Sequence, residues 1–327
     1  MTCFLSGDIG GTKTLLQLSA TADEHAQLLK KSYASAEYAS LEDMIDVFLA
    51  EAGVRDIRAA CFALAGPVSG RVVKLTNLPW EVDGDYLAER FSIDKVALIN
   101  DFEAVAYGVP LLHADDFHTL QTNREHKDGV KLVVGAGTGL GVAWLTWQQN
   151  SHVVYPSEGG HMDFAPVDDL QSLLLRYLQH SHGHVSYERI VSGPGLAAIY
   201  QFMHETGLAS PSLEMIAAIK QGDIPAAITR FAENNEEPIA RMTVDLFLAV
   251  YGAFLGNLAL ASLPRGGIYI AGGIAAKIST QISSSVFLES YLSKGRYRSL
   301  LASLPVHIIL NTEVGLMGAN YIARRQL

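Results

Sequence analysis

Two glycine- and threonine-containing turns, each directly after an apolar run, are the feature that most constrains how this chain folds. The first lies in residues 5–14 (Leu-Ser-Gly-Asp-Ile-Gly-Gly-Thr-Lys-Thr) and the second in residues 133–141 (Val-Val-Gly-Ala-Gly-Thr-Gly-Leu-Gly). Alternating apolar residues follow both, so each predicts a strand, a tight turn and a second strand. Backbone N–H groups of glycine turns bind anions, and a threonine hydroxyl adds a donor. One such turn in each half predicts a duplicated fold that holds one polyphosphate from both sides.

Size and charge exclude one large class of partners. A chain of 327 residues, of which 49% are hydrophobic, is long enough for two domains with a core each. Its formal net charge is −10, and no run of basic residues occurs in the sequence. Binding to nucleic acid depends on clustered Lys and Arg side chains that neutralise phosphates, so we expect no nucleic-acid partner.

The cysteines and the one long apolar segment indicate a soluble protein of the cytoplasm. Cys3 and Cys61 lie in apolar, strand-like runs and are expected to be buried thiols of a reducing compartment. No signal peptide is predicted, because Asp8 interrupts the short apolar run at the N-terminus. Residues Val244–Leu263 are apolar enough to resemble a membrane span, but their glycines and the otherwise globular sequence favour a buried core helix.

The order of predicted elements is that of an α/β protein with a mainly parallel sheet. In the first half the hairpin is followed by a helix over Leu41–Ala52, strands over Ala59–Leu64 and Val72–Leu75, a helix over Asp85–Arg90 and a strand over Val96–Ile99. In the second half the hairpin over Lys131–Leu145 precedes helices at 169–180, 195–205, 213–221, 224–234 and 243–261, strands at 267–270 and 306–310, and a helix at 315–325. Residues 121–129 are expected to form a surface loop. No low-complexity linker separates the halves, so they should share a cleft.

The first turn carries a candidate site for phosphate and magnesium. Gly10 and Gly11 permit the turn, Thr12 can donate to a phosphoryl oxygen, and Asp8 at the strand end can orient Mg²⁺ through water. A plain hairpin turn is the alternative, since short glycine patterns recur by chance. The repetition of the pattern in the second half favours the phosphate site.

Asn100 and Asp101 follow an apolar strand directly. In a parallel α/β domain the carboxyl ends of the strands face the ligand, and an aspartate there can accept the proton of a hydroxyl that attacks a phosphoryl group. Asp101 can equally be the N-cap of the helix that begins near Phe102. On the local sequence alone, we favour the cap.

A second polar cluster lies in residues 158–163, Glu-Gly-Gly-His-Met-Asp. The two glycines allow the side chains of Glu158 and His161 to converge on one small polar molecule, either as hydrogen-bonding groups or as a pair of metal ligands. No second His or Cys stands at ligand spacing, which favours hydrogen bonds to hydroxyl groups. Taken alone, Glu188 is an ordinary helix glutamate beside Arg189.

Gly272 and Gly273 join a buried strand to a helix. Paired glycines at such a junction allow a flat nucleoside to lie close to the backbone. Any tight connection between a strand and a helix has a similar sequence, so this segment is informative only together with the others.

These segments, in this order, resemble the bacterial-type glucokinase family of the actin/hexokinase/Hsp70 fold superfamily. The matching segments are residues 7–12, 65–68, 76–77 with Trp80, 99–102, 135–141, 158–161, 188–189, 192–195, 271–274 and 315–318. The resemblance implies two α/β domains of duplicated ribonuclease-H-like, actin-like ATPase fold, with an active-site cleft between them. We expect a small domain of residues 1–111 plus 311–327 and a large domain of residues 112–310.

The resemblance implies phosphorylation of glucose at its 6-hydroxyl by ATP and Mg²⁺, the first step of glycolysis, in a homodimeric, cytoplasmic enzyme. Asp101 would be the catalytic base and could still cap its helix. Sugar hydroxyls would be held by Asn77, Asn100, Asp101, Glu158, His161 and Glu188. Phosphates would be held by Asp8, Gly10, Gly11, Thr12, Gly137 and Thr138, adenosine would lie beside Gly272 and Gly273, and Mg²⁺ would be bound through Asp8.

Some alternatives stay open. A related branch, the repressor/open-reading-frame/kinase proteins, shares the Asp-x-Gly-Gly-Thr and Glu-x-Gly-His patterns but adds a cysteine-rich zinc motif after the histidine. No cysteine follows Cys61, so the chain departs from that branch. The substrate could be another hexose or an N-acetylhexosamine, or the chain could be a sugar-binding regulator without catalysis. The presence of Asp8, Asp101 and both turns argues against the regulator.

Overall fold

The computed structural model describes residues 3–20, 27–54, 56–75, 77–234, 237–278, 282 and 285–325. Thr76, which belongs to one of the segments that resemble the family, lies outside these residues. By their internal contacts, the residues form two compact units. The first comprises Met1–Ala114, Val154–Pro156 and Asn311–Leu327, and the second comprises Asp115–Val153 and Ser157–Leu310.

The first unit is built on a five-stranded sheet in the order β3-β2-β1-β4-β7. Its strands are β1 Cys3–Ile9, β2 Lys13–Ala20, β3 Gln27–Ala34, β4 Ile57–Leu64 and β7 Lys95–Asn100. β1, β2 and β3 pair antiparallel, whereas β4 and β7 run parallel to β1. A separate ribbon pairs β5 Val72–Lys74 with β6 Glu81–Asp83. The carboxyl ends of β1, β4 and β7 therefore lie at the same end of the sheet.

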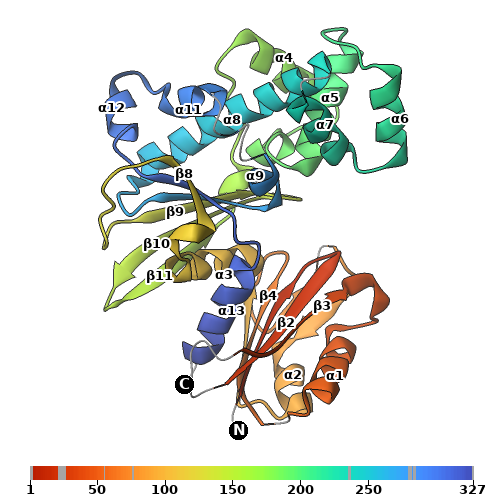
Figure 1. Cartoon of the computed structure of the whole chain (residues 1–327), viewed down its shortest axis with the longest axis vertical. Helices are drawn as coiled ribbons and strands as arrows, with labels where there is room; N and C mark the ends of the chain where they lie inside the picture. Colours follow the sequence, from red (N-terminus) through yellow and green to blue (C-terminus); the bar gives the residue numbers. More distant parts are fainter. Residues whose placement is uncertain are drawn as a thin grey trace. The chain divides into compact units, whose positions relative to one another are not determined.

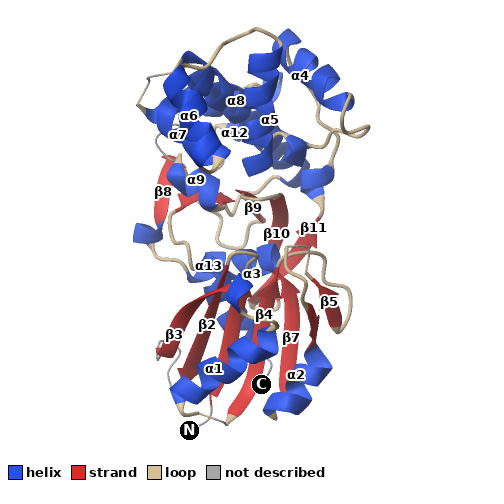
Figure 2. Ribbon diagram, turned by 90° about the vertical axis from the view of Figure 1, so that its right-hand side faces the viewer, coloured by secondary structure: helices blue, strands red, loops and turns tan. Residues whose placement is uncertain are grey.

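Helices cover both faces of this sheet. α1 Leu41–Ala52 and α2 Gly84–Phe91 pack on the face that carries Leu5 and Phe62 (Figure 2). α3 Asp101–Gly108 and α13 Val314–Arg325 pack on the opposite face, which carries Phe4 and Cys61 (Figure 1). Successive residues of a strand point to opposite faces, so β1 and β4 supply apolar side chains to two cores.

The contact between α3 and α13 depends on glycine. A Cβ on Gly318 would lie 1.8 Å from the carbonyl oxygen of Ala104, and a Cβ on Gly108 would lie 2.1 Å from that of Val314. Side chains cannot approach a carbonyl so closely, and hence the two helices can cross at this distance only with glycine at both positions.

The second unit repeats this arrangement in a six-stranded sheet with the order β11-β10-β9-β12-β13-β8. Its strands are β8 Phe117–Gln121, β9 Lys131–Ala136, β10 Leu140–Gln148, β11 Ser151–Ser157, β12 Ile268–Ala271 and β13 Val306–Ile309. β10 is antiparallel to β9, β12 and β13 run parallel to β9, and β8 is antiparallel to β13. The strands β11-β10-β9-β12-β13 of this sheet correspond, in order, to β3-β2-β1-β4-β7 of the first sheet. This correspondence confirms the predicted duplication.

Most of the α-helices that the structure describes belong to the second unit. They are α4 Asp169–Gln179, α5 Gly193–Glu205, α6 Leu213–Gln221, α7 Ile224–Glu233, α8 Pro238–Ser262, α9 Gly273–Lys277, α11 Ser285–Leu292 and α12 Arg298–Leu301.

Short 3₁₀ helices occur in both units. They are η1 Ser35–Glu37, η2 Val109–Leu111, η3 Ala114–Asp116, η4 Gly159–His161, η5 Tyr187–Arg189 and η6 Gly295–Tyr297.

α8 is the apolar segment that resembles a membrane span in the sequence. It is the one helix among the described residues that is long and apolar enough to cross a membrane. In the structure it packs against α5, α7, α11 and β9, and most of its side chains are buried. A Cβ on Gly252 would lie 2.2 Å from the carbonyl oxygen of Phe287 on α11, so a glycine sets this contact too. The interpretation as a core helix of the second unit is confirmed.

Some elements differ from the sequence-based predictions. α1 has the predicted bounds, and α8 begins at Pro238 instead of Thr243. The strands β3, β6, β8 and β11 and the helices α11 and α12 are not predicted from the sequence, and Gln121, expected to begin a surface loop, is the last residue of β8. Glu188 lies in the 3₁₀ helix η5 and not in an α-helix.

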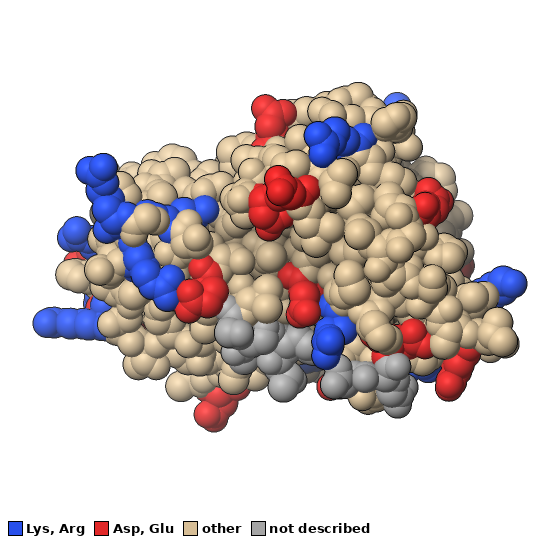
Figure 3. All heavy atoms as spheres, turned by 90° about the horizontal axis from the view of Figure 1, so that it is seen from above, with Lys and Arg blue, Asp and Glu red and all other residues tan. Residues whose placement is uncertain are grey.

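Charged side chains are spread thinly over the face shown in Figure 3. Lys and Arg gather mainly at the left-hand end of this view, beside Asp and Glu, and uncharged residues cover most of the rest. Some of the described charged residues form exposed ion pairs, for example Arg298 with Glu289 at 2.9 Å. Such pairs contribute little to stability, which therefore depends on the cores of the two units.

Candidate active site

The turn between β1 and β2, residues 10–13, is hereafter the first turn, and its backbone requires glycine. The Gly10 N–H donates to the Lys13 carbonyl at 3.1 Å. A Cβ on Gly10 would lie 2.8 Å from the Lys13 carbonyl oxygen, and one on Gly11 would lie 2.7 Å from the Cβ of Asn77. Asn77 therefore lies directly against the turn, whereas Thr12 is exposed at its tip.

Two carboxylates lie close together at the same end of the first sheet. Asp8 is near the end of β1, and Asp101 directly follows β7. The pKa of Asp8 is raised to about 6, first by burial and then by the nearby charge of Asp101, while Lys13 acts in the opposite direction. Neighbouring carboxylates disfavour each other's ionised form, and a cation beside them relieves that repulsion. The pair is therefore a candidate cation-binding group.

Asn100, and not Asp101, is the N-cap of α3, which corrects one expectation. Its Oδ1 accepts from the N–H groups of Phe102 at 2.9 Å and Glu103 at 3.2 Å, and its Nδ2 donates to the Gly66 carbonyl at 2.9 Å. Among the described contacts, one amide hydrogen of Asn100 remains for a ligand. Asp101 is the first residue of the helix, and its Oδ1 accepts from the Phe102 N–H at 2.8 Å.

The turn between β9 and β10, residues 137–139, is hereafter the second turn, and it is anchored to two neighbouring segments. The Gly193 N–H, at the start of α5, donates to the Gly137 carbonyl at 2.8 Å. The Leu140 N–H donates to Oε2 of Glu188 at 2.9 Å. A Cβ on Gly139 would lie 2.6 Å from the same oxygen, so glycine is what allows the Glu188 carboxylate to reach the turn.

Glu158, His161 and Glu188 converge in the second unit. The Nε2 of His161 lies 4.0 Å from Oε2 of Glu158 and 3.8 Å from Oε1 of Glu188. A Cβ on Gly160 would lie 2.1 Å from the Leu140 carbonyl oxygen, so this glycine brings the 3₁₀ helix η4 against β10. Side chains of Glu158 and His161 are 75% and 56% exposed and that of Glu188 is 30% exposed, which leaves all three accessible to a small polar ligand.

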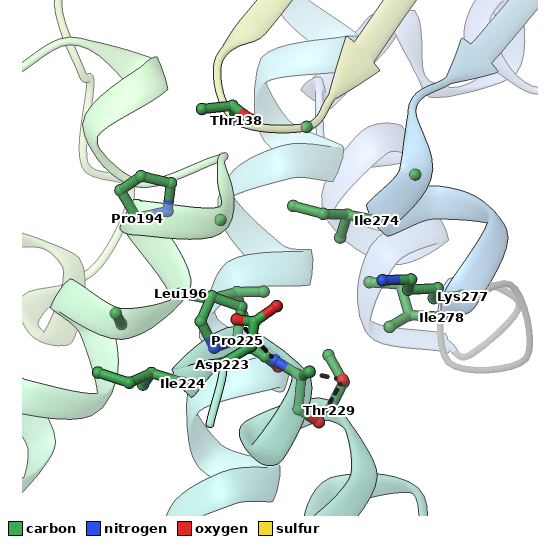
Figure 4. A pocket seen from close by; sticks show the side chains of 15 residues that line it. Thr138, Pro194, Leu196, Asp223, Ile224, Pro225, Thr229, Ile274, Lys277 and Ile278 are labelled. Atoms are coloured by element: carbon green, nitrogen blue, oxygen red, sulfur yellow. Dashed lines mark hydrogen bonds between the residues drawn. The ribbon is translucent and has the colours of Figure 1, made fainter. Parts of the chain in front are cut away.

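A pocket of about 470 Å³ borders the second turn and lies entirely within the second unit (Figure 4). Its walls come from the turn, from α5, from α7 with the residue before it, and from α9. The walls are mainly apolar and include Leu196, Ile224, Pro225, Ile274 and Ile278. The polar groups are Thr138 at the turn, Asp223 and Thr229 at the α7 wall, and Lys277 on α9.

Three of the residues that the resemblance implies for the nucleotide, Gly137, Thr138 and Gly273, line this pocket. Gly272 directly precedes the last of them and has a φ of 94°, and a Cβ there would lie 2.3 Å from the Ala136 carbonyl oxygen. The residues of the α7 wall are not predicted from the sequence. Its one local signal is a proline in the first turn of a helix, which is common to helices in general.

Among the described residues, no group of three or more His, Cys, Asp or Glu side chains could hold a metal ion. The described residues thus add no third ligand to a metal pair of Glu158 and His161. Mg²⁺ does not need such a group, because it is commonly bound by one or two carboxylates together with phosphate oxygens.

The two units share an order of five strands, and in each a glycine turn joins two antiparallel strands, β1 to β2 and β9 to β10. This arrangement defines the class of actin-like ATPase folds that includes sugar kinases. Solved structures agree. A glucokinase from an Antarctic psychrotroph has a TM-score of 0.83 at 30% identity, over 99% of each chain. A ROK family glucokinase from Streptomyces griseus shares the fold, with a TM-score of 0.64 at 21% identity over 99% of each chain.

The sequence places the chain within this class. The family model Glucokinase matches residues 5–326. A curated glucokinase of Nostoc sp. is 45% identical over 341 residues, which cover 99% of this chain and 100% of that protein. One of Synechocystis sp. is 40% identical over 97% of this chain and 96% of its own length. The chain belongs to the glucokinase family and is a hexose kinase that acts on glucose.

Proposed function

We propose that the chain transfers the terminal phosphoryl group of MgATP to the 6-hydroxyl of glucose, with Asp101 as general base. The observation that carries this proposal is that Asp101 lies close enough to Asp8 to raise its pKa, while Asp8 stands two residues before Gly10 of the first turn. A carboxylate and an anion-binding turn at one end of a sheet supply a proton acceptor and a phosphate site together.

Asp101 would accept the proton of the 6-hydroxyl as its oxygen attacks the phosphorus in line. The hydrogen bond from the Phe102 N–H to Oδ1, at 2.8 Å, fixes the orientation of the carboxylate before the substrate arrives. Such preorganisation removes part of the entropy cost of reaching the reactive geometry.

Glucose hydroxyls would be bound by Asn77 and Asn100 of the first unit and by Glu158, His161 and Glu188 of the second. Carboxylates accept hydrogen bonds, amides and imidazoles can donate or accept them, and together such groups fix the orientation of a sugar. Support within the second unit comes from the convergence of His161 on both carboxylates, at 3.8 and 4.0 Å.

The nucleotide would bind to both turns and to the pocket of the second unit. The phosphates would be held by Gly10, Gly11 and Thr12 of the first turn and by Gly137 and Thr138 of the second. A volume of about 470 Å³ with mainly apolar walls suits a nucleoside, since small-molecule sites span about 300–1,000 Å³. Gly272 and Gly273 would flank the adenosine.

The residues present fit a magnesium ion. Asp8 has a pKa raised to about 6 by burial and by the charge of Asp101, which is the environment a divalent cation would stabilise. Asp8 would hold the ion, directly or through water, and the ion would neutralise charge on the phosphates. The test is to remove magnesium with a chelator, which should abolish formation of the sugar phosphate.

The test of the function is a product assay with purified protein, MgATP and glucose, in which the sugar phosphate is identified by mass and position. Glucose 6-phosphate with equimolar ADP is the expected result. ADP formed only with another hexose or an N-acetylhexosamine would keep the mechanism and change the substrate. Absence of product with every sugar, combined with sugar binding, would instead support the regulator.

We also propose that the enzyme is a cytoplasmic homodimer with no nucleic-acid or membrane partner, as the family resemblance implies. The net charge of −10 is consistent with the lack of a nucleic-acid partner, and the burial of α8 in the second unit is consistent with the lack of a membrane partner. Sedimentation velocity at micromolar concentration would contradict the assembly if it found only the mass of one chain.

A further inference from the structure

Ser35 is a buried polar residue that no part of the sequence analysis or of the proposed function uses. It is the first residue of η1, directly after the edge strand β3, and its exposed fraction is 0%. A serine hydroxyl that is removed from water must find hydrogen-bond partners inside the protein. Its partners show what the residue does.

The described partners of the Ser35 hydroxyl and N–H all belong to the first turn or to the start of β2. The Ser35 hydroxyl donates to the Gly10 carbonyl at 2.7 Å, and the Ser35 N–H donates to the Thr12 carbonyl at 3.1 Å. The hydroxyl of Thr14, which is also fully buried, lies 3.0 Å from the Ser35 hydroxyl. Because Ser35 uses its only hydroxyl proton on Gly10, Thr14 must be the donor of that contact.

These bonds determine the direction of a backbone donor in the turn. In a trans peptide the C=O and the N–H point in opposite directions. Since the Gly10 carbonyl points to Ser35, the Gly11 N–H of the same peptide points away from Ser35. The bond from the Ser35 N–H to the Thr12 carbonyl fixes the peptide between Thr12 and Lys13, on the other side of the turn. Without the Ser35 hydroxyl, the Gly10 carbonyl would lose this partner, and only backbone bonds to the Lys13 and Thr12 carbonyls would hold the turn among the described contacts.

We propose that Ser35 is a positioning residue for the phosphates of ATP, which acts by holding the first turn in its anion-binding conformation. This inference rests on the proposed function, because it assumes that the first turn binds phosphate. Ser35 itself does not touch the nucleotide. Its contribution is preorganisation: a turn already held in the bound conformation loses less entropy when the phosphates bind.

The test compares Ser35→Ala with Ser19→Ala. Ser19 is a matched control because it is also buried, at 1%, lies on β2 of the same sheet and donates to Oδ1 of Asn320 at 2.8 Å, away from the turn. Both variants remove the donor to a partly buried acceptor and should lose similar stability. We expect only Ser35→Ala to raise the KM for ATP, by about tenfold, because the net contribution of such bonds corresponds to about that factor. The KM for glucose should stay within about twofold in both.

A second readout separates positioning from a general loss of structure. Adenosine lacks phosphates, so its affinity by calorimetry should be the same in wild type and Ser35→Ala, whereas that of ATP should fall. An equal loss for adenosine and ATP, or equal KM values for ATP in the two serine variants, would overturn the inference. If wild type binds ATP but makes no sugar phosphate, the proposed function fails while the calorimetric comparison still tests Ser35.

Thr14 provides a pair of variants in case Ser35→Ala does not fold. Thr14→Val keeps the shape of the side chain and removes the donor, whereas Thr14→Ser keeps the hydroxyl in a smaller side chain. We expect a rise of about threefold in the KM for ATP with Thr14→Val and recovery with Thr14→Ser. The same KM in both would contradict a role for the hydroxyl chain.

Discussion

The Glu188 carboxylate accepts a hydrogen bond from the backbone N–H of Leu140 at 2.9 Å. Its other oxygen lies 3.8 Å from Nε2 of His161. One side chain thus joins the end of the second turn, proposed to hold phosphate, to a histidine proposed to hold the sugar. A change at Glu188 should therefore affect both substrates.

We predict that Glu188→Gln raises the KM for glucose and the KM for ATP together, each by about 10-fold to 100-fold. The reason is that a hydrogen bond to a charged acceptor contributes about 1.5–3 kcal/mol. The neutral amide weakens the hydrogen bond from Leu140 and removes the charge that faces His161. Glu158→Gln is the control, because this carboxylate also faces His161 but is 75% exposed, and it should raise only the KM for glucose. Steady-state kinetics with each substrate varied would show the contrast, and identical patterns in the two variants would refute it.

Asp101→Asn should lower kcat by about 10²–10⁴-fold and leave the affinity for glucose within about threefold. The amide has the size of the carboxylate and can still accept from the Phe102 N–H, but it cannot take up a proton. Glu103→Gln is the matched control, two residues further along α3, and its kcat should stay within about twofold. Turnover is measured by coupled assay and glucose affinity by calorimetry. Full activity in Asp101→Asn would remove this residue from the chemistry.

The raised pKa of Asp8 predicts how stability depends on pH. The folded-state pKa, about 6, lies above the unfolded value of 3.8, so the folded chain binds this proton more tightly. The corresponding stability is present below the unfolded pKa and is lost as the pH rises through about 6. At neutral pH the ionised Asp8 therefore destabilises the fold of the apoprotein.

Asp8→Asn should accordingly be more stable than wild type at a pH of about 7.5, by about 1 kcal/mol once solvent screening is allowed for. The difference should shrink at a pH of about 5. Urea unfolding without nucleotide or magnesium measures both values. A variant less stable than wild type at the higher pH would show that the Asp8 charge is already compensated.

Filling the pocket of the second unit should weaken ATP selectively. Ala226, on the first turn of α7, lines the pocket and is exposed, so Ala226→Trp should fold normally and raise the KM for ATP by at least about tenfold. Ala217→Trp on α6 is the control, since Ala217 is also exposed and is not among the lining residues of the pocket. Activity with inorganic polyphosphate, if the enzyme has any, should survive, because that donor has no nucleoside. Equal KM values for ATP in the two variants would place the nucleoside elsewhere.

The sequence predicts the inner elements of both sheets because their residues are buried and apolar. β1, β4 and β9 are almost wholly buried, and their apolar runs end at the glycine turns or at Gly66. Of the missed strands, β3, β8 and β11 lie at the edge of a large sheet, and β6 belongs to the two-stranded ribbon. An edge strand packs on fewer neighbours and tolerates polar residues, so its sequence resembles that of a loop. Lys30 and Lys31 in β3 illustrate this.

The candidate site shows the same division. Residues in motifs with unusual backbone demands, such as Gly10 and Gly272, could be chosen from the sequence because few residue types fit those positions. The sequence could not decide between Asn100 and Asp101 as N-cap, since both are good capping residues. What distinguishes them is a contact distant in sequence, the hydrogen bond from the Asn100 amide to the Gly66 carbonyl. Ser35 and Asp223 could not be found either, because a lone serine or aspartate carries no pattern.

The position of α13 has a consequence for how the protein is made. This helix packs on α3, β1 and β4 and brings Ala319 and Ala323 into their shared core. A ribosome delivers β1 and α3 well before α13, so the part of this face that α13 covers stays open until that helix has emerged. Most of the second unit, between Asp115 and Leu310, emerges before α13 and can form its core first. The first unit is therefore completed after the second, although its first strand is made earlier.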